Sequence, residues 1–159
     1  MTALTVAIAN ELSSDETLQP LLGSTPGFGP WVFTQTPFAR VENTQKCLIV
    51  VVHEGSWATA NDYNTEQFPR IAVDIWADPQ RNGDRSVALD DTEDKIEAVL
   101  KIVKKHLHRV SNSNPDGTSI FFGPVRIHST KFTTGPEIFP ISDGNGGQMG
   151  RSYFNIAID

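Results

Sequence analysis

The sequence contains a single cysteine, Cys47, so no disulfide can form within one chain. Cys47 opens the apolar run Cys47–Val52, where a buried and unreactive thiol is expected. This run is the longest apolar stretch and is far too short to cross a bilayer. No basic residue precedes the first apolar positions, which argues against a secretory signal. We therefore expect a soluble protein made in a reducing cytoplasm, with no membrane partner.

The sequence also lacks an excess of positive charge. Its 13 Lys and Arg residues stand against 19 Asp and Glu residues, giving a net charge of −6 and a pI of about 5.1. This balance argues against a protein that binds nucleic acid by neutralising phosphates, so we expect no specific nucleic-acid binding. With 159 residues and no internal repeat, the chain is predicted to form one domain, 1–159.

No motif for catalysis or metal binding stands out among the histidines. His106 and His108 lie two residues apart on a predicted helix, so their side chains point in different directions. His53 and His128 fall in separate predicted strands, and no cysteine pair completes a zinc pattern. We therefore predict that the protein is not an enzyme, with no catalytic residues, no cofactor-binding residues and no metal ligands.

The glycine-rich segment Gly144–Gly147 does not change this prediction. No Gly-Lys-Ser/Thr follows it, so a flexible loop is favoured over a phosphate-binding loop.

The strongest local pattern lies between Asp90 and Val110 and predicts an amphipathic helix. Asp90, Asp91 and Thr92 offer capping oxygens at its start, and basic residues near its end complement the helix dipole. Apolar residues recur every three or four positions and form one stripe: Ile96, Val99, Leu100, Val103, Leu107 and Val110. The basic residues are Lys101, Lys104, Lys105 and Arg109, for which a solvated face is favoured over a docking surface.

Other patterns predict a short N-terminal helix and several strands. Leu4, Ile8 and Leu12 fall four residues apart, and Asp15 is placed to cap a following turn. The predicted strands are Cys47–His53, Arg70–Trp76, Ser119–Phe132 with a break at Gly123-Pro124, and Tyr153–Ile158, with a further start at Trp31–Phe33. The predicted fold class is α+β: a mainly antiparallel sheet of about four strands, packed by a long central helix and a short N-terminal helix.

Two predicted loops carry large apolar residues that could serve an interface. The polar segment Glu54–Pro69 contains Trp57, Tyr63 and Phe68, which either anchor a partner or fold back over the sheet edge. The glycine-rich segment Gly135–Gly150 contains Ile138, Phe139 and Ile141. Because long loops reach neighbouring molecules most easily, these six residues are the predicted interface.

Four stretches taken together resemble the tail terminator (tail completion) proteins of long-tailed bacteriophages. They are the opening helix with Asp15-x-x-Leu18-x-x-Leu21-Leu22-Gly23, the strand Leu48–Glu54, the strand Val73–Asp78, and the acid-capped helix from Asp91. The resemblance covers most of the chain and weakens after about Asn112.

This resemblance implies a subunit of a virion tail that assembles in the cytoplasm of the bacterial host. Such subunits form a hexameric ring that caps the head-proximal end of the tail tube and joins it to the neck or head. The implied partners are other copies of the chain, the tail tube protein and a neck or head connector protein. A subunit that is monomeric when isolated, with the tube serving as template, is compatible with this role.

Three alternatives stay open at this point. A head-tail connector (neck) protein would have similar size and acidity. A small soluble hydrolase would act through His53, Glu54 or Asp62, although Glu54, Asp62 and Glu66 are as readily explained as a solvated loop. A monomeric binding module would use the three aromatic residues of Glu54–Pro69.

Overall fold

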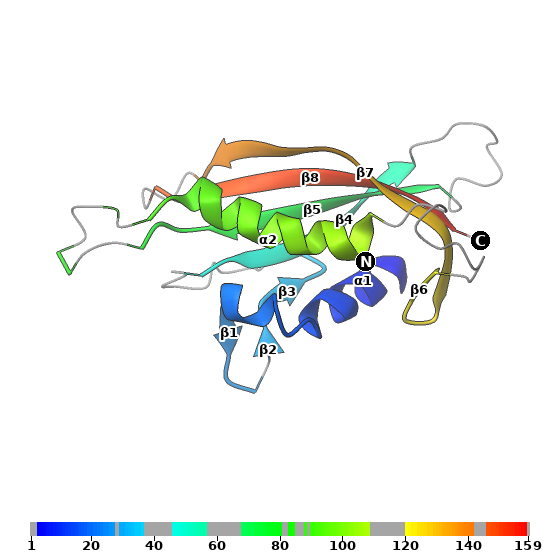
Figure 1. Ribbon diagram of the computed structural model, residues 1–159, viewed down its shortest axis with the longest axis horizontal. Helices are drawn as coiled ribbons and strands as arrows, with labels where there is room; N and C mark the ends of the chain where they lie inside the picture. The colour runs from blue at the N-terminus through cyan, green and yellow to red at the C-terminus, as the bar shows by residue number, and fades with distance from the viewer. Residues whose placement is uncertain are drawn as a thin grey trace.

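The computed structural model describes residues 3–27, 29–36, 46–56, 68–80, 83–84, 88, 90–108, 120–141 and 146–158. Figure 1 shows two α-helices lying over a long sheet. The helices are α1 (Ala3–Ser13) and α2 (Thr92–Leu107), with a short 3-10 turn η1 (Gln19–Leu21). The strands are β1 (Ser24–Thr25), β2 (Gly29–Pro30), β3 (Val32–Phe33), β4 (Leu48–Ser56), β5 (Pro69–Ala77), β6 (Ile120–Phe122), β7 (Val125–Pro140) and β8 (Gln148–Ile158).

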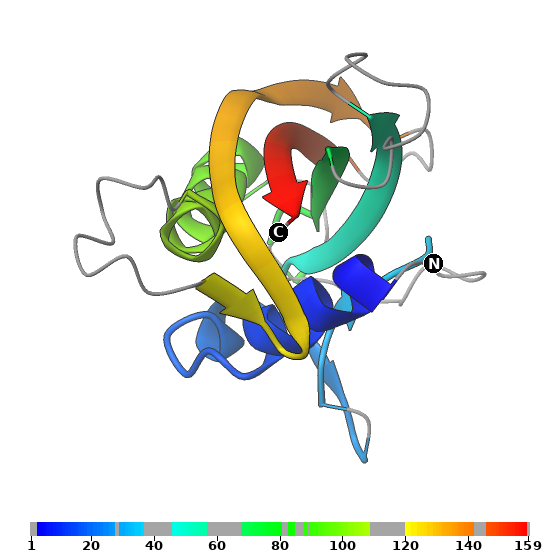
Figure 2. The same ribbon diagram turned by 90° about the vertical axis from the view of Figure 1, so that its right-hand side faces the viewer.

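The main sheet has six strands in the order β3-β4-β5-β8-β7-β6, and β1 and β2 form a separate antiparallel pair. All neighbours in the main sheet are antiparallel except β3 and β4, which run parallel. The sheet curls so strongly that β7 arches from the side of α1 over the top of the molecule (Figure 2). Helices α1 and α2 cover the same face of this sheet.

The predicted fold class is therefore wrong in its main features. The sheet is curled, mixed and six-stranded, and the protein is mostly sheet, with helices of only 11 and 16 residues in the described part of the chain. Strands β3 and β6 lie within predicted strand segments, but with two and three residues they are too short for a sequence pattern to show where they pair in the sheet. Strand β7 continues through Gly135-Pro136, a pair that normally signals a loop.

Helix α2 forms for the reasons that its sequence predicts. The side chain of Asp91 caps it by accepting a hydrogen bond from the backbone N–H of Glu93 at 2.9 Å. Its buried residues reproduce the predicted stripe: Ile96, Val99, Leu100, Val103 and Leu107. The helix starts at Thr92 and ends at Leu107, whereas the last predicted residues, Arg109 and Val110, lie outside the described residues.

Glycine at position 150 lets α2 approach β8 closely. A Cβ at this position would come within 2.5 Å of Cγ2 of Ile96, which is fully buried in the stripe of α2. Any larger residue at position 150 would therefore push the start of α2 away from the sheet. This contact fixes how deeply the apolar stripe enters the core.

The first part of β4, residues 48–51, is buried on both faces, whereas residues 53–56 at its end are exposed. Ile49 and Val51 point into the core beneath the helices, whereas Leu48 and Val50 pack with Trp31 on the opposite face. Strand β5, within which the predicted Arg70–Trp76 lies, is buried on both faces from Ile71 to Ile75, with β4 and β8 on either side of it.

A histidine on α2 connects the two helices. Nε2 of His106 lies 2.5 Å from Oδ2 of Asp15, and Nδ1 lies 3.5 Å from a carboxylate oxygen of Glu11 on α1. Asp15 also accepts hydrogen bonds from the backbone N–H groups of Thr17 and Leu18, so it caps the predicted turn after α1. His106 thus joins the end of α2 to α1 and to this turn.

We expect the replacement of Leu107 by Ala to lower the free energy of unfolding by about 2–5 kcal/mol, because a fully buried leucine leaves a cavity between α2 and the sheet. Chemical denaturation measures this loss. The exposed neighbour Lys105→Ala is the matched control and should change stability by less than about 0.5 kcal/mol. A loss below about 1 kcal/mol for Leu107→Ala would contradict the packing of α2.

We also expect stability to depend on pH through His106. The carboxylates of Glu11 and Asp15 raise its pKa above the usual value of 6.5, although burial opposes them. Folding therefore favours the protonated form of His106. The contribution of this form to the free energy of unfolding is complete below pH 6.5 and is lost as pH rises through the higher folded-state pKa.

The measurement compares wild-type protein with His106→Gln by denaturant unfolding from about pH 5.5 to about pH 9. Asp15 stays ionised throughout, since its hydrogen bonds to Thr17 and His106 lower its pKa. The stability difference should be largest at the acid end and shrink toward the alkaline end. A constant difference would show that the charge of His106 contributes nothing.

Candidate functional site

Among the described residues, the histidines considered for catalysis lie on separate elements. His53 is exposed on β4, and His128 is exposed on β7. His108 lies at the end of α2, where its Nδ1 accepts a hydrogen bond from the backbone N–H of Phe132 at 3.1 Å. Within the described ranges no three His, Cys, Asp or Glu side chains are grouped to hold a metal ion. Asp62 lies outside these ranges.

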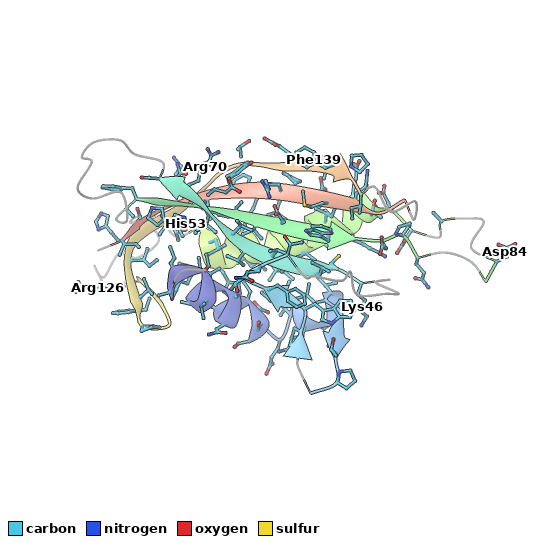
Figure 3. All side chains as sticks on the ribbon, turned by 180° about the vertical axis from the view of Figure 1, so that it is seen from behind. Lys46, His53, Arg70, Asp84, Arg126 and Phe139 are labelled. Atoms are coloured by element: carbon cyan, nitrogen blue, oxygen red, sulfur yellow. The ribbon has the colours of Figure 1, made fainter. Side chains whose placement is uncertain are left out.

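The sheet face opposite the helices carries a charged network, and Figure 3 looks onto this face. Asp74 on β5 is only 3% exposed, and Arg151 on the neighbouring strand β8 binds it through two hydrogen bonds of 2.7 and 2.8 Å. Nη1 of Arg151 also lies 3.4 Å from the carboxylate of Glu54. The hydrogen bonds to Asp74 raise the pKa of Arg151 above its already high value.

Aromatic and apolar residues extend this face on both sides of the charged network. The guanidinium carbon of Arg70 lies 4.2 Å from the centre of the Tyr153 ring, a cation–π contact. Trp31, Leu48 and Val50 form a small buried cluster with the partly buried Phe33, Val52 and Trp76. The pairing of Asp74 with Arg151 depends on a strand register that no local sequence pattern reveals.

The residues of the predicted interface have different environments. Trp57 and Tyr63 lie outside the described residues. Phe68 is half-buried, and its carbonyl accepts a hydrogen bond from Ser56 Oγ at 3.1 Å. Ile138 packs against the core, whereas Phe139 is 42% exposed.

The segment Gly135–Gly150 was predicted to be a flexible loop, and its described part corrects this. β7 continues to Pro140 and β8 begins at Gln148, so most of the segment forms paired strands. Between them, the backbone N–H of Ile141 donates to the carbonyl of Gly147 at 2.9 Å. The interface role of the six residues stays a prediction.

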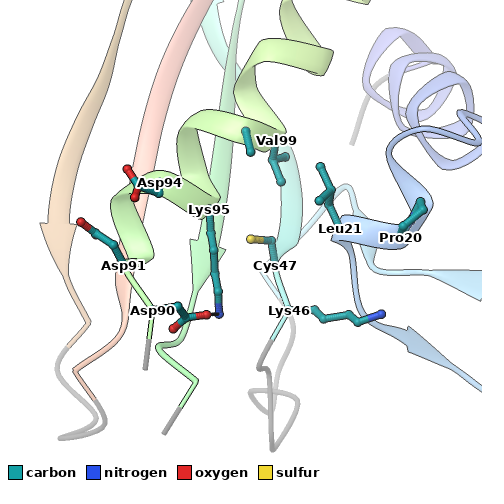
Figure 4. A pocket seen from close by; sticks show the side chains of 10 residues that line it. Pro20, Leu21, Lys46, Cys47, Asp90, Asp91, Asp94, Lys95 and Val99 are labelled. Carbon is teal, nitrogen blue, oxygen red and sulfur yellow. Dashed lines mark ion pairs between the residues drawn. The ribbon is translucent and has the colours of Figure 1, made fainter. Parts of the chain in front are cut away.

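A groove of about 480 Å³ lies between η1, the start of β4 and the start of α2 (Figure 4). Leu21, Cys47, Ala98 and Val99 supply its apolar lining. Charged residues surround the lining: Asp90, Asp91, Asp94, Lys46 and Lys95. No sequence pattern predicts this groove, because its lining comes from three segments that are distant in the chain.

The charges around the groove are unevenly balanced. Nζ of Lys95 lies 2.6 Å from Asp90 and donates a hydrogen bond to the carbonyl of Asp78 at 2.9 Å, so Lys95 is held within the molecule. Asp91 and Asp94 are exposed on the α2 side, and the side chain of Lys46 extends away from them (Figure 4). The α2 side of the groove therefore presents negative charge beside an apolar surface.

Cys47 does not give the groove a reactive centre. Burial raises the pKa of its thiol to about 11, so the thiolate that a nucleophile needs is scarce at neutral pH. This agrees with the buried, unreactive thiol that the sequence predicted.

Comparison with known proteins gives a fold but no family. No protein-family model and no curated protein sequence matches the chain. Among solved structures, a chain of the virion of a native gene transfer agent (GTA) particle matches with a TM-score of 0.57 and 11% sequence identity. The match covers 98% of this chain and 94% of that chain. At this identity the comparison shows a shared fold over nearly the whole length of both chains.

We expect the two partners of the Asp74–Arg151 pair to respond unequally to replacement. Arg151→Met should lower the free energy of unfolding by about 3 kcal/mol, because it leaves the buried carboxylate of Asp74 without its cation. Asp74→Asn should cost less, since Arg151 has a 28% exposed side chain and keeps access to water and Glu54.

Urea denaturation of both variants measures this order. Equal losses for the two variants would contradict the proposed asymmetry.

Proposed function

We propose that this chain is a structural protein of a phage-like particle. The observation that carries this proposal is the match to a virion chain over 98% of its length. Because so little of either chain lies outside the match, the shared fold accounts for the whole subunit rather than for one module of it. We infer that the chain, too, is built to contact other virion proteins and that it has no catalytic activity, cofactor or metal.

More narrowly, we propose that it is a tail terminator. The stretches that resemble this family lie in elements that form one continuous core: α1 with the turn after it, β4, β5 and α2. The proposed assembly is a hexameric ring that caps the head-proximal end of the tail tube and joins it to the neck or head. Its partners are other copies, the tail tube protein and the neck or head connector protein.

The physical properties of the chain suit a ring through which DNA passes. A net charge of −6 repels phosphates, so duplex DNA has no general attraction to the subunit. Neither described helix is long and apolar enough to span a membrane. We place the protein in the virion tail, assembled in the cytoplasm of the bacterial host.

A head-tail connector protein is the second candidate, because the match to a virion chain supports both roles equally. A terminator stops the growth of the tail tube, whereas a connector joins the finished tail to the head. Loss of a terminator leaves tubes without a length limit, whereas loss of a connector leaves finished tails that fail to bind heads.

Deletion of the gene in the genome that encodes this chain separates these roles. We expect electron microscopy of the particles to show free heads and overlong tubes, and wild-type protein supplied from a plasmid to restore joined particles. Tails of normal length beside unattached heads would assign the connector role instead. Normal particles would show that the protein is not required for head-to-tail assembly.

A further inference from the structure

Two of the exposed apolar side chains, Leu21 and Phe121, lie far apart along the molecule. Only Leu21, Phe121 and Phe139 are large apolar residues with substantial exposure in the described part of the chain. Leu21 lines the groove, near Lys46, whereas Phe121 lies on β6, in the hairpin with Arg126. Figure 3 shows Lys46 and Arg126 toward opposite ends of the long axis. Scattered exposed residues are normal, so their chemistry must decide whether these two matter.

The hairpin of β6 and β7 presents an aromatic and a basic side chain together. Phe121 and Arg126 are direct cross-strand partners, so both side chains leave the same face of the hairpin. Phe121 is 52% exposed and Arg126 is exposed. On the other face, Phe122 is fully buried in the core. The hairpin is therefore anchored by one face and offers the other to solvent.

The groove at the other end has the complementary chemistry. Its apolar lining from Leu21, Cys47, Ala98 and Val99 suits an aromatic ring, and its α2 side carries the exposed carboxylates of Asp91 and Asp94. Lys95 is paired with Asp90 and not with these two residues, and although one oxygen of Asp91 accepts the capping hydrogen bond from Glu93, both carboxylates keep their negative charge toward a basic side chain. A volume of about 480 Å³ is ample for the aromatic side chain of Phe121.

The open edge of β7 is a poorer place for a neighbour to bind. Its pairing with β8 has irregularities between Ile127 and Ser129, between Phe132 and Thr134, and between Thr134 and Glu137. Pro136 and Pro140 have no backbone N–H to donate to an added strand. Bulges and prolines are features that discourage pairing of sheet edges between molecules, so side-chain docking is favoured over strand addition.

We propose that the β6–β7 hairpin of one copy docks into the groove of a second copy, with Phe121 on the apolar lining and Arg126 beside Asp91 and Asp94. This contact joins two different surfaces of the same chain. Contacts of that kind repeat from copy to copy and close into a ring when the rotation allows. The inference rests on the proposed ring-forming function and names the surfaces that would form the ring.

Sedimentation equilibrium over increasing protein concentration, up to about 1 mM, measures self-association of the wild-type chain and its variants. Phe121→Ser, Arg126→Glu and Asp94→Arg should each weaken self-association about tenfold or more. The combined variant Arg126→Glu with Asp94→Arg should recover wild-type association to within about threefold, because the charges then attract again.

Two matched controls carry the same charge changes beside the proposed contact. Lys131→Glu reverses an exposed charge farther along β7, and Glu93→Arg reverses the exposed charge next to Asp94 without lining the groove. Both should leave self-association within about threefold of wild type. Unfolding midpoints of all variants verify that they fold. Asp91 is not replaced, because it caps α2.

A cross-linking experiment tests the same pairing in a different way. Ala98→Cys places a thiol on the groove and Pro124→Cys places one at the exposed turn of the hairpin, so that Phe121 is kept, while the native Cys47 is buried. The double variant should give a ladder of disulfide-linked multimers under mild oxidation, whereas each single variant should stop at dimers. The absence of this ladder would overturn the proposed contact.

Other results would also contradict the docking of the hairpin into the groove of a second copy. Wild-type protein that stays monomeric at about 1 mM, or self-association that ignores the hairpin and groove variants, would overturn the docking of a second copy. The gene-deletion phenotype decides the terminator role separately. Unterminated tails from a hairpin variant that still self-associates normally would assign the hairpin to another virion protein, and so contradict the proposal as well.

Discussion

Burial of the α2 stripe against the curled sheet is the interaction on which the other features depend. Ile96, Val99, Val103 and Leu107 are at most 1% exposed, so successive turns of the helix are held against β5, β8 and β7. At about 25 cal/mol per Å² of apolar surface, burial of this kind is the main favourable term in folding. The close approach at Gly150 sets the depth of the contact, because a side chain there would collide with Ile96. The position of α2 in turn determines one wall of the groove and the place of His106 beside α1.

The opposite face of the sheet shows a different balance of forces. A carboxylate as buried as Asp74 is costly unless a cation and hydrogen bonds replace its water, and Arg151 supplies both. Such a pair adds little net stability over an apolar pair, but it is satisfied only when β5 and β8 are in this register. We infer that Asp74 and Arg151 contribute mainly to the precision of strand pairing in a sheet whose strong curl must be reproduced in every copy.

The sequence predicted those features that are encoded by short-range periodicity. The α2 stripe, the Asp91 cap, the Asp15 turn and the buried strand from Leu48 all follow from residues within a few positions of one another. The six-stranded sheet did not follow, because β7 crosses Gly135-Pro136 and its neighbours are set by long-range pairing. The groove and the exposed hairpin surface were not predicted from the sequence for the same reason. Only the tertiary structure places Leu21 beside Val99, or Phe121 opposite Arg126.

A ring subunit needs two different surfaces held in a fixed relation, because a small error in their angle is multiplied at each contact before the ring closes. The hairpin is anchored through Phe122, and the groove is bounded by α2, and both Phe122 and the α2 stripe belong to one continuous apolar cluster. Close-packed interiors transmit strain rather than absorb it, so the two ends of the molecule are linked by a stiff connection. Structured elements, such as the hairpin and the start of α2, meet this need better than long loops alone. In the proposed ring, the curvature of the sheet would set the direction in which the hairpin projects relative to the groove.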